Sequence, residues 1–138
     1  IAKECARQAE ALQTRVINYP DGSSLRMEEG EMGITLLGVK MRPNVEHYAG
    51  QFQNGRYNGY GSIELVESKG HYVGQFVNDR YHGVGHLKLE SGDEYFGGFA
   101  EGAYHGYGRY TVSSKGKVTT GIFKRGKFEQ AIDPGKLR

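Results

Sequence analysis

Three histidines, His82, His86 and His105, have the residue type and the closeness in sequence that a metal site requires. If the segments around them are extended, His82 and His86 lie roughly 13 Å apart, and His82 and His105, in matching strands of neighbouring hairpins, roughly 10 Å apart. One ion held about 2 Å from each ligand cannot bridge such distances. We therefore expect no metal site, and we interpret His82 and His105 as occupants of a recurring His-Gly position.

Three Gly-x-Gly triplets suggest a second kind of chemistry, the binding of a nucleotide phosphate. They are Gly59-Tyr60-Gly61, Gly83-Val84-Gly85 and Gly106-Tyr107-Gly108. A dinucleotide-binding loop also needs a third glycine at a fixed spacing and a helix that begins there, and neither follows these triplets. The single cysteine, Cys5, has no neighbour that would activate its thiol. We expect no catalytic residues, no cofactor and no small-molecule substrate, and hence no enzymatic activity.

The glycines belong instead to a sequence repeat. YAGQFQNGRYNGYG begins at Tyr48, YVGQFVNDRYHGVG at Tyr72, YFGGFAEGAYHGYG at Tyr95, and a shortened TTGIFKRGKF at Thr119, with spacings of 24, 23 and 24 residues. Residues 48–128 hold 17 of the 22 glycines and 15 of the 16 aromatic residues, so the composition is ordered and not of low complexity. Periods of about 20 to 50 residues are typical of stacked repeat architectures. One period before Tyr48 lies Leu25, which indicates a degenerate first repeat over residues 17–47.

Each unit has the spacing of a β-hairpin. In YAGQF the alternate residues Tyr48, Gly50 and Phe52 share one face of an extended segment. Asn54-Gly55 follows, and both residues of such a pair tolerate the positive φ angles of a tight hairpin turn. The same place is taken by Asn78-Asp79, Glu101-Gly102 and Arg125-Gly126, of which Asp79 suits that backbone conformation less well than glycine.

The alternation of glycine with aromatic residues has a physical interpretation. Glycine weakens a strand unless another group must approach the backbone closely. We expect aromatic rings to lie over the glycines of adjoining strands, and the column Phe52, Phe76, Phe99 and Phe123 to stack along the array. Burying one large ring contributes about 2 to 3 kcal/mol, which exceeds a cost of about 1 kcal/mol for the glycine.

These stretches resemble MORN (membrane occupation and recognition nexus) repeats, whose pattern is Tyr-x-Gly-x-Phe-x-Asn-Gly-x-x-x-Gly-x-Gly. The resemblance covers residues 48–128, as three full units and a terminal half unit, and the departures are Asp79, Glu101 and Thr119. It implies a mostly β fold: an elongated, single-layer antiparallel array of consecutive β-hairpins with an aromatic-lined groove. It also implies a module that acts by binding, in membrane–organelle junctions, in cytoskeletal scaffolds or as a regulatory extension of an enzyme.

The N-terminal segment has a different pattern. Helix formers fill residues 1–16, and one apolar stripe contains Ile1, Cys5, Ala9, Leu12 and Val16. A helix of this length is marginal alone, so it must dock on the sheet or on another chain. The predicted organisation is an amphipathic helix over residues 1–16, the degenerate repeat over 17–47, the array over 48–128 and a tail over 129–138.

Charge distribution and cysteine content limit the cellular compartments and the partners that we expect for the protein. Residues 1–108 carry ten Lys or Arg against fourteen Asp or Glu, whereas residues 109–138 carry eight against two. A single cysteine favours a cytoplasmic or organellar compartment over secretion, and no apolar run reaches the roughly 18 residues of a membrane span. Because the chain begins at Ile1, we expect a processed product, a fragment or the ordered part of a longer chain.

Two binding functions remain open. The first is a protein-interaction or scaffold module within a larger assembly, which receives a partner segment in a groove lined by Tyr57, Tyr60, Tyr81, Val84, Tyr104 and Tyr107. The second is a membrane-associated module that binds anionic phospholipids through Arg109, Lys115, Lys117, Lys124, Arg125 and Lys127. We expect no nucleic-acid partner, because the net charge is only +2 and few rings accompany the basic residues.

Overall fold

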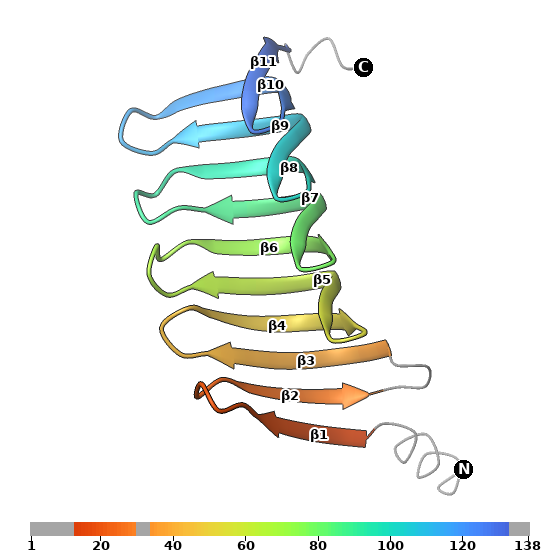
Figure 1. The fold of residues 1–138 in the computed structure, drawn as a ribbon. Helices are drawn as coiled ribbons and strands as arrows, with labels where there is room; N and C mark the ends of the chain where they lie inside the picture. Colours follow the sequence, from red (N-terminus) through yellow and green to blue (C-terminus); the bar gives the residue numbers. More distant parts are fainter. Residues whose placement is uncertain (1–12, 30–33, 133–138) are drawn as a thin grey trace, which may run out of the picture.

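A computed structural model describes residues 13–29 and 34–132. These residues form one open sheet of 11 antiparallel strands that lie in sequence order (Figure 1). The strands are β1 (Gln13–Asn18), β2 (Ser24–Glu29), β3 (Ile34–Arg42), β4 (Glu46–Gln53), β5 (Arg56–Leu65), β6 (His71–Val77), β7 (Arg80–Lys88), β8 (Glu94–Ala100), β9 (Ala103–Val112), β10 (Lys117–Lys124) and β11 (Lys127–Ala131). The prediction of a mostly β, single-layer array of hairpins is confirmed, with β1 and β11 as the two edges of the sheet.

The predicted N-terminal helix is wrong where the structure describes it. Residues 13–16 of the expected helix belong to β1, which pairs residue by residue with β2, from Gln13 opposite Glu29 to Asn18 opposite Ser24. The β-branched residues Thr14, Val16 and Ile17 favour a strand once a partner strand is available. Residues 1–12, which include Cys5, lie outside the described residues.

The sheet continues across the predicted boundary between residues 47 and 48. Strand β3 pairs with β4, and Gly38 lies opposite Gly50. Leu25, at the position one period before Tyr48, is buried in the same core. These positions are compatible with a degenerate first repeat, whose assignment stays a prediction.

The tight turns lie where the sequence predicts them. Asn54 and Gly55 have φ angles of 52° and 78°, and the corresponding pairs in the later hairpins also have positive φ at both residues. Successive turns are joined along the array by backbone hydrogen bonds: the amides of Asp79, Gly102 and Gly126 donate to the carbonyl oxygens of Tyr57, Tyr81 and Tyr104, respectively. Each turn is therefore tied to the hairpin before it.

Asp79 is explained by a hydrogen bond that glycine cannot make. Its φ of 71° is unfavourable for a residue with a side chain. The Tyr57 amide, however, donates to the Asp79 carboxylate over 2.8 Å, while the Asp79 amide donates to the Tyr57 carbonyl oxygen over 3.0 Å. This reciprocal pair offsets the backbone cost.

Three of the strands bend sharply near their first residues, as Figure 1 shows for β5, β7 and β9. The bend falls at Gly59, Gly83 and Gly106, which have φ angles of 93°, 72° and 79°. The pairing register shifts at the same level of each hairpin, for example between Gly50 and Phe52. An irregularity of this kind bends a strand, and here it returns the first residues of the strand over one face of the sheet.

That face, which we call the inner face, holds the aromatic core. Tyr57 lies parallel to Tyr48 with ring centroids 3.8 Å apart, and Tyr81 and Tyr104 stack in the same way on Tyr72 and Tyr95. The expected self-stacking column of phenylalanines is wrong. Each of those phenylalanines meets tyrosine rings edge-on, as Phe76 meets Tyr48 at 5.2 Å and Tyr72 at 5.0 Å, because edge-to-face packing is favourable between aromatic rings.

The glycines of the inner face accommodate the leading tyrosines. Gly50 and Gly61 lie opposite each other on β4 and β5, and the Tyr48 side chain runs over both. The Tyr48 hydroxyl donates to the Gln51 carbonyl oxygen over 2.6 Å, so the ring is fixed at both ends. A Cβ atom at Gly61 would lie 2.5 Å from Tyr48 Cε2, closer than non-bonded carbon atoms come. The expectation that rings lie over glycine backbone is confirmed.

Burial raises the pKa of the core tyrosine hydroxyls above the ordinary value of about 10. It raises the pKa of Tyr95 to about 12, and the neighbouring Tyr104 acts in the same direction. The pKa of Tyr57 is raised by burial, and also by the hydrogen bond that its hydroxyl donates to Glu46. Burial is the largest cause for the other shifted tyrosines, which are Tyr48, Tyr72, Tyr81, Tyr104 and Tyr110.

Gly85→Ala should destabilise the protein through a steric clash alone. Its φ is not in the left-handed region, but the new Cβ atom would lie 2.5 Å from Tyr72 Cζ. We expect the free energy of unfolding in urea to fall by about 1 to 3 kcal/mol. Gly70→Ala is the matched control, because its Cβ atom would meet Leu65 Cδ1 at an ordinary 3.5 Å. Equal effects of the two substitutions would contradict this account of the glycines.

Asp79→Ala should lower the free energy of unfolding by about 1 to 2 kcal/mol, because the hydrogen bond is lost and the backbone cost remains. Asp79→Gly also loses the bond but relieves a backbone cost of about 1 kcal/mol, so its loss should be smaller. Chemical unfolding of both variants beside Asp79→Asn, which keeps a side-chain oxygen, measures these effects. An alanine variant as stable as the wild-type chain would show that the carboxylate is not the reason for Asp79.

Stability should decline in alkaline solution. The unfolded chain loses tyrosine protons near pH 10, whereas the folded chain keeps them, up to about pH 12 at Tyr95. The tyrosine contribution is therefore complete below about pH 10 and is lost as the pH rises to about 12, by about 1.4 kcal/mol per pH unit for each such tyrosine. Tyrosinate absorbance should appear at higher pH in the folded protein than in the urea-unfolded chain. Coincident titrations would contradict the prediction.

Candidate interaction surface

The face of the sheet opposite the stacked rings, which we call the outer face, carries exposed apolar side chains. Successive side chains of a strand point to opposite faces of the sheet. Each of these apolar residues follows or precedes a residue that faces inward, so its own side chain faces outward. Tyr60, for example, adjoins Gly61, whose Cβ direction leads to the Tyr48 ring. Other exposed apolar residues of the outer face include Leu37, Val39, Val73, Val84, Phe96 and Tyr107.

Three of these residues form a line across the sheet that we call the apolar row: Tyr60 on β5, Val84 on β7 and Tyr107 on β9. Their exposed fractions are 66%, 57% and 44%. Consecutive members lie two strands apart, which corresponds to a separation of about 10 Å. All three were predicted site residues, and the structure brings them together on one exposed face.

Two glutamines brace the first part of the row. The Gln51 side-chain oxygen accepts a hydrogen bond from the Tyr60 amide, and the Gln75 side-chain oxygen accepts one from the Val84 amide, each over 2.8 Å. The Gln75 amide group also donates to the Tyr60 hydroxyl over 3.3 Å. These glutamines cover the bends at Gly59 and Gly83, because a Cβ atom at either glycine would meet the glutamine side chain.

The third repeat has glycine in place of this glutamine, at Gly98. A hollow of about 710 Å³ opens there on the outer face, and we call it the glycine hollow. Val84, Phe96 and Tyr107 line it together with the backbone of Gly98 and Gly106, and the remaining lining residues are Gly83, Gly97, Phe99, His105 and Arg109. The lining combines bare backbone, apolar side chains and two basic residues, and it includes no carboxylate.

Tyr57, Tyr81 and Tyr104 do not share this surface. They lie on the inner face, stacked on the leading tyrosines, and Tyr57 is only 5% exposed. The structure therefore does not bring the six predicted groove residues together. The two tyrosine sets separate because Tyr57 and Tyr60 are three residues apart on one strand, and an odd spacing puts their side chains on opposite faces.

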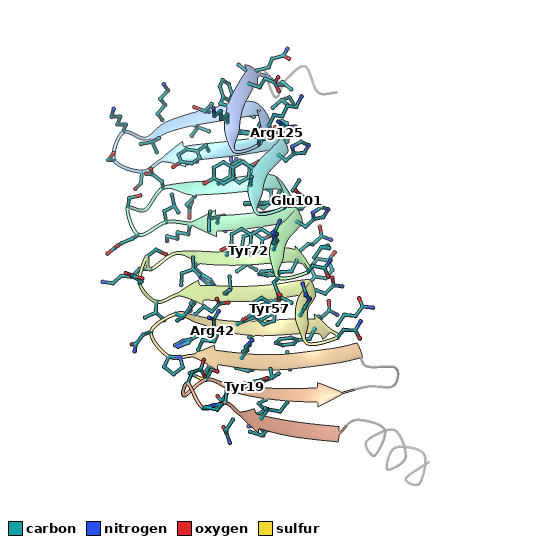
Figure 2. All side chains as sticks on the ribbon, viewed as in Figure 1. Tyr19, Arg42, Tyr57, Tyr72, Glu101 and Arg125 are labelled. Atoms are coloured by element: carbon teal, nitrogen blue, oxygen red, sulfur yellow. The ribbon has the colours of Figure 1, made fainter. Side chains whose placement is uncertain are left out.

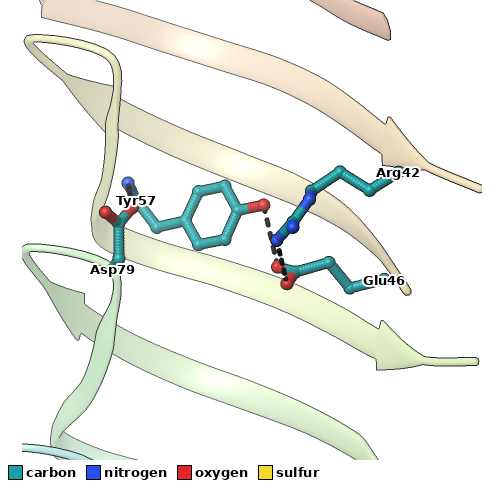
Figure 3. A network of polar contacts seen from close by, with 4 residues as sticks. All are labelled: Arg42, Glu46, Tyr57 and Asp79. Atoms are coloured by element: carbon teal, nitrogen blue, oxygen red, sulfur yellow. Dashed lines mark hydrogen bonds and ion pairs between the residues drawn. The ribbon is translucent and has the colours of Figure 1, made fainter. Parts of the chain in front are cut away.

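Tyr57 is also held by polar contacts (Figure 3). Its hydroxyl donates to a Glu46 carboxylate oxygen over 2.9 Å, and the other oxygen of that carboxylate pairs with Arg42 over 2.9 Å. Its amide donates to Asp79, as described above. Figure 2 shows Tyr57 and Tyr72 over the sheet, whereas Glu101 and Arg125 lie at the turns along its rim. Tyr57 is thus a structural residue.

The six predicted basic residues are distributed over separate parts of the sheet. Arg109 lies on the outer face of β9, opposite Phe96. Lys115 and Lys117 lie at the β9–β10 connection, whereas Lys124, Arg125 and Lys127 surround the β10–β11 turn at the far end of β10. An eight-residue strand separates these two ends by about 23 Å. The predicted lipid-binding residues do not form one patch.

The histidines contact different neighbours. His71 Nε2 lies 2.9 Å from the Ser62 hydroxyl, and His86 Nε2 lies 3.5 Å from Glu94. Over residues 13–29 and 34–132 no group of three His, Cys, Asp or Glu side chains is arranged to hold a metal ion. Within the same ranges no helix is long and apolar enough to cross a membrane.

Sequence reasoning missed Phe96 and Gly98, which define the hollow. A signal was present, because Gln51 and Gln75 occupy the same repeat position and the third repeat breaks the pattern with Gly98. Phe96, 53% exposed, similarly stands where the earlier repeats have Ala49 and Val73. The two positions at which the third repeat differs from the first two therefore indicate the hollow, which the positions shared by all three repeats do not.

The fold and the surface define a single-sheet β-hairpin repeat protein with a buried aromatic face and an exposed apolar face. The MORN repeat family model matches residues 48–64, 72–94 and 95–116, and the chain is accordingly a MORN repeat protein. MORN repeats are generally associated with protein–protein or membrane interactions. Comparison with curated proteins gave no significant match.

Proposed function

We propose that the protein is a non-enzymatic protein-interaction module, a structural subunit of a larger assembly, which receives a partner segment along the apolar row. The observation that carries the proposal is the exposure of Tyr60, Val84 and Tyr107 on one face, while the aromatic core lies on the other. The core does not use these side chains, so their apolar surface is available to a partner.

The spacing of the row suits a helical partner. A helix rises about 1.5 Å per residue, so residues seven apart lie about 10.5 Å apart. That rise is close to the separation of about 10 Å between positions two strands apart. An amphipathic helix with apolar residues at every seventh position would place one anchor beside each member of the row. Aromatic residues such as Tyr60 and Tyr107 are frequent carriers of binding energy in such contacts.

Lipid binding remains the alternative, with weaker support. Each basic side chain near an anionic membrane contributes about 1 kcal/mol, and the contributions add only if the side chains face the membrane together. Arg109 and the residues at the two ends of β10 are too widely separated for that arrangement on one flat surface. For the compartment we propose the cytoplasm or an organelle, on the single-cysteine argument given above.

Replacing both tyrosines of the row should remove partners without unfolding the protein. We expect Tyr60→Ser with Tyr107→Ser to lose the proteins that the wild-type chain captures from its source cells, as identified by mass spectrometry. Urea unfolding should change little, because both side chains are exposed.

The matched control is Val45→Ser with Val66→Ser, which removes exposed apolar surface outside the row and should retain the same partners. Lys124→Glu with Arg125→Glu and Lys127→Glu tests the lipid alternative by vesicle sedimentation. Retention of every partner by the folded double tyrosine variant would refute the proposed surface. Loss of vesicle binding in the triple variant would then favour the membrane.

A further inference from the structure

We propose that the glycine hollow binds a peptide segment in which one bulky apolar side chain neighbours a carboxylate. The inference rests on the proposed protein-interaction function and adds to it the place of the main anchor and the charge of the partner. It is drawn from the difference between the third repeat and the first two, in which Gln51 and Gln75 occupy the position of Gly98.

The shape of the hollow suits an apolar anchor. Its volume of about 710 Å³ lies within the range of about 300 to 1,000 Å³ that is usual for ligand sites. Val84, Phe96 and Tyr107 form its apolar sides, and the backbone of Gly98 and Gly106 contributes to its floor. A Cβ atom at Gly106 would meet nothing within 4 Å, so the hollow is open at that glycine, whereas the carbonyl oxygen of His105 occupies the Cβ position of Gly98.

The first two repeats place a glutamine oxygen beside the residue equivalent to Tyr107. The amides of Tyr60 and Val84 donate to the side-chain oxygens of Gln51 and Gln75. Tyr107 occupies the same place in the third repeat, and Gly98 supplies no such oxygen. The space that the glutamine fills beside Gly59 and Gly83 is open beside Gly106, so a carbonyl or carboxylate oxygen of a bound peptide can enter it.

Charge complementarity indicates an acidic partner. His105 and Arg109 are the ionisable lining residues apart from Tyr107, and no carboxylate lines the hollow. The Arg109 side chain lies opposite Phe96 on the same face, so a group that packs on Phe96 comes close to a guanidinium. Arginine binds carboxylates with paired hydrogen bonds. An Asp or Glu next to the apolar anchor would meet both requirements.

The same features favour a peptide over a lipid surface. The hollow contains one arginine, and the remaining predicted basic residues lie at the two ends of β10. A flat anionic surface would therefore engage few of them together. A peptide side chain can enter the hollow while its backbone passes over the apolar row.

The experiment uses a phage-displayed library of random dodecapeptides, selected on the full chain. Gly106→Asn should block the hollow without a clash, because a Cβ atom at Gly106 meets nothing within 4 Å and asparagine tolerates its φ of 79°. The equivalent Cβ atoms at Gly59 and Gly83 point at the glutamine side chains, so the new side chain should fill the glutamine place. Arg109→Glu reverses the charge, and Arg26→Glu is its matched control on the same row of the outer face, at β2.

We expect selected peptides to carry Asp or Glu beside Phe, Leu, Met or Trp. A synthetic peptide with the selected sequence should bind Gly106→Asn and Arg109→Glu at least about tenfold more weakly than the wild-type chain, and Arg26→Glu equally well. Circular dichroism of each variant checks folding. If Gly106→Asn is destabilised, the comparison of Arg109→Glu with Arg26→Glu still tests the inference.

Selected peptides without an acidic residue, or with unchanged affinity for folded Gly106→Asn and Arg109→Glu, would overturn the inference. If such peptides still lose affinity on Tyr60→Ser, the proposed function stands and only the hollow is excluded. If no peptide is enriched, or if only phosphatidylserine-containing vesicles bind in an Arg109-dependent way, both proposals fall.

Discussion

The packing of a tyrosine ring on a pair of glycines is the interaction on which this structure depends. Tyr48 lies over Gly50 and Gly61, and Tyr72 and Tyr95 lie over the equivalent pairs. The hydroxyl of each tyrosine donates to a carbonyl oxygen three residues further along its own strand, which fixes the direction of the ring. A single sheet has no second layer to cover it, so its rings must pack against its own backbone. Glycine is the residue that leaves room for them.

The alternation of glycine and tyrosine also explains why the two faces of the sheet differ. Glycines at the bends turn the second tyrosine of each repeat over the first, and this stacking completes the inner face. The outer face receives the intervening residues, which the core does not need. The third repeat differs at one such position, where Gly98 replaces the bracing glutamine and lies close to the carbonyl oxygen of His105. The hollow opens beside it, and Tyr104 still stacks on Tyr95 on the other face.

Much of the fold could be predicted from the sequence, because repeats and turns have local signatures. The 24-residue recurrence of Tyr48 and the Asn54-Gly55 pair indicate the hairpins and their turns directly. The face of Tyr57 follows from alternation, because Tyr57, Gly59 and Gly61 are spaced two residues apart, whereas Tyr60 falls on the other face. The stacking of Tyr57 on Tyr48 does not follow from that pattern, because it needs the bend at Gly59, whose φ is 93°. Likewise, helix propensity at residues 13–16 was overridden by pairing with β2, a contact that no local pattern reveals.

The candidate site could be predicted only in part, because part of it depends on contacts that no local sequence pattern reveals. Tyr60, Val84 and Tyr107 follow from alternation within each repeat, whereas the hollow depends on the absence of a side chain at Gly98. An absent side chain becomes informative only when the neighbouring repeats show what it would have covered. Charge was also misleading, because basic residues that are close in sequence between Arg109 and Lys127 lie on different parts of the sheet.

The central claim is that the glycines exist to admit the tyrosine rings, and a double-mutant cycle of Tyr95→Leu and Gly108→Ala measures it most directly. A Cβ atom at Gly108 would lie 2.5 Å from Tyr95 Cζ. Without the ring, the alanine should therefore be tolerated. The account predicts that Gly108→Ala destabilises the wild-type chain by about 1 to 3 kcal/mol and the Tyr95→Leu variant by much less, which gives a coupling free energy of similar size. Equal destabilisation in both backgrounds would contradict it.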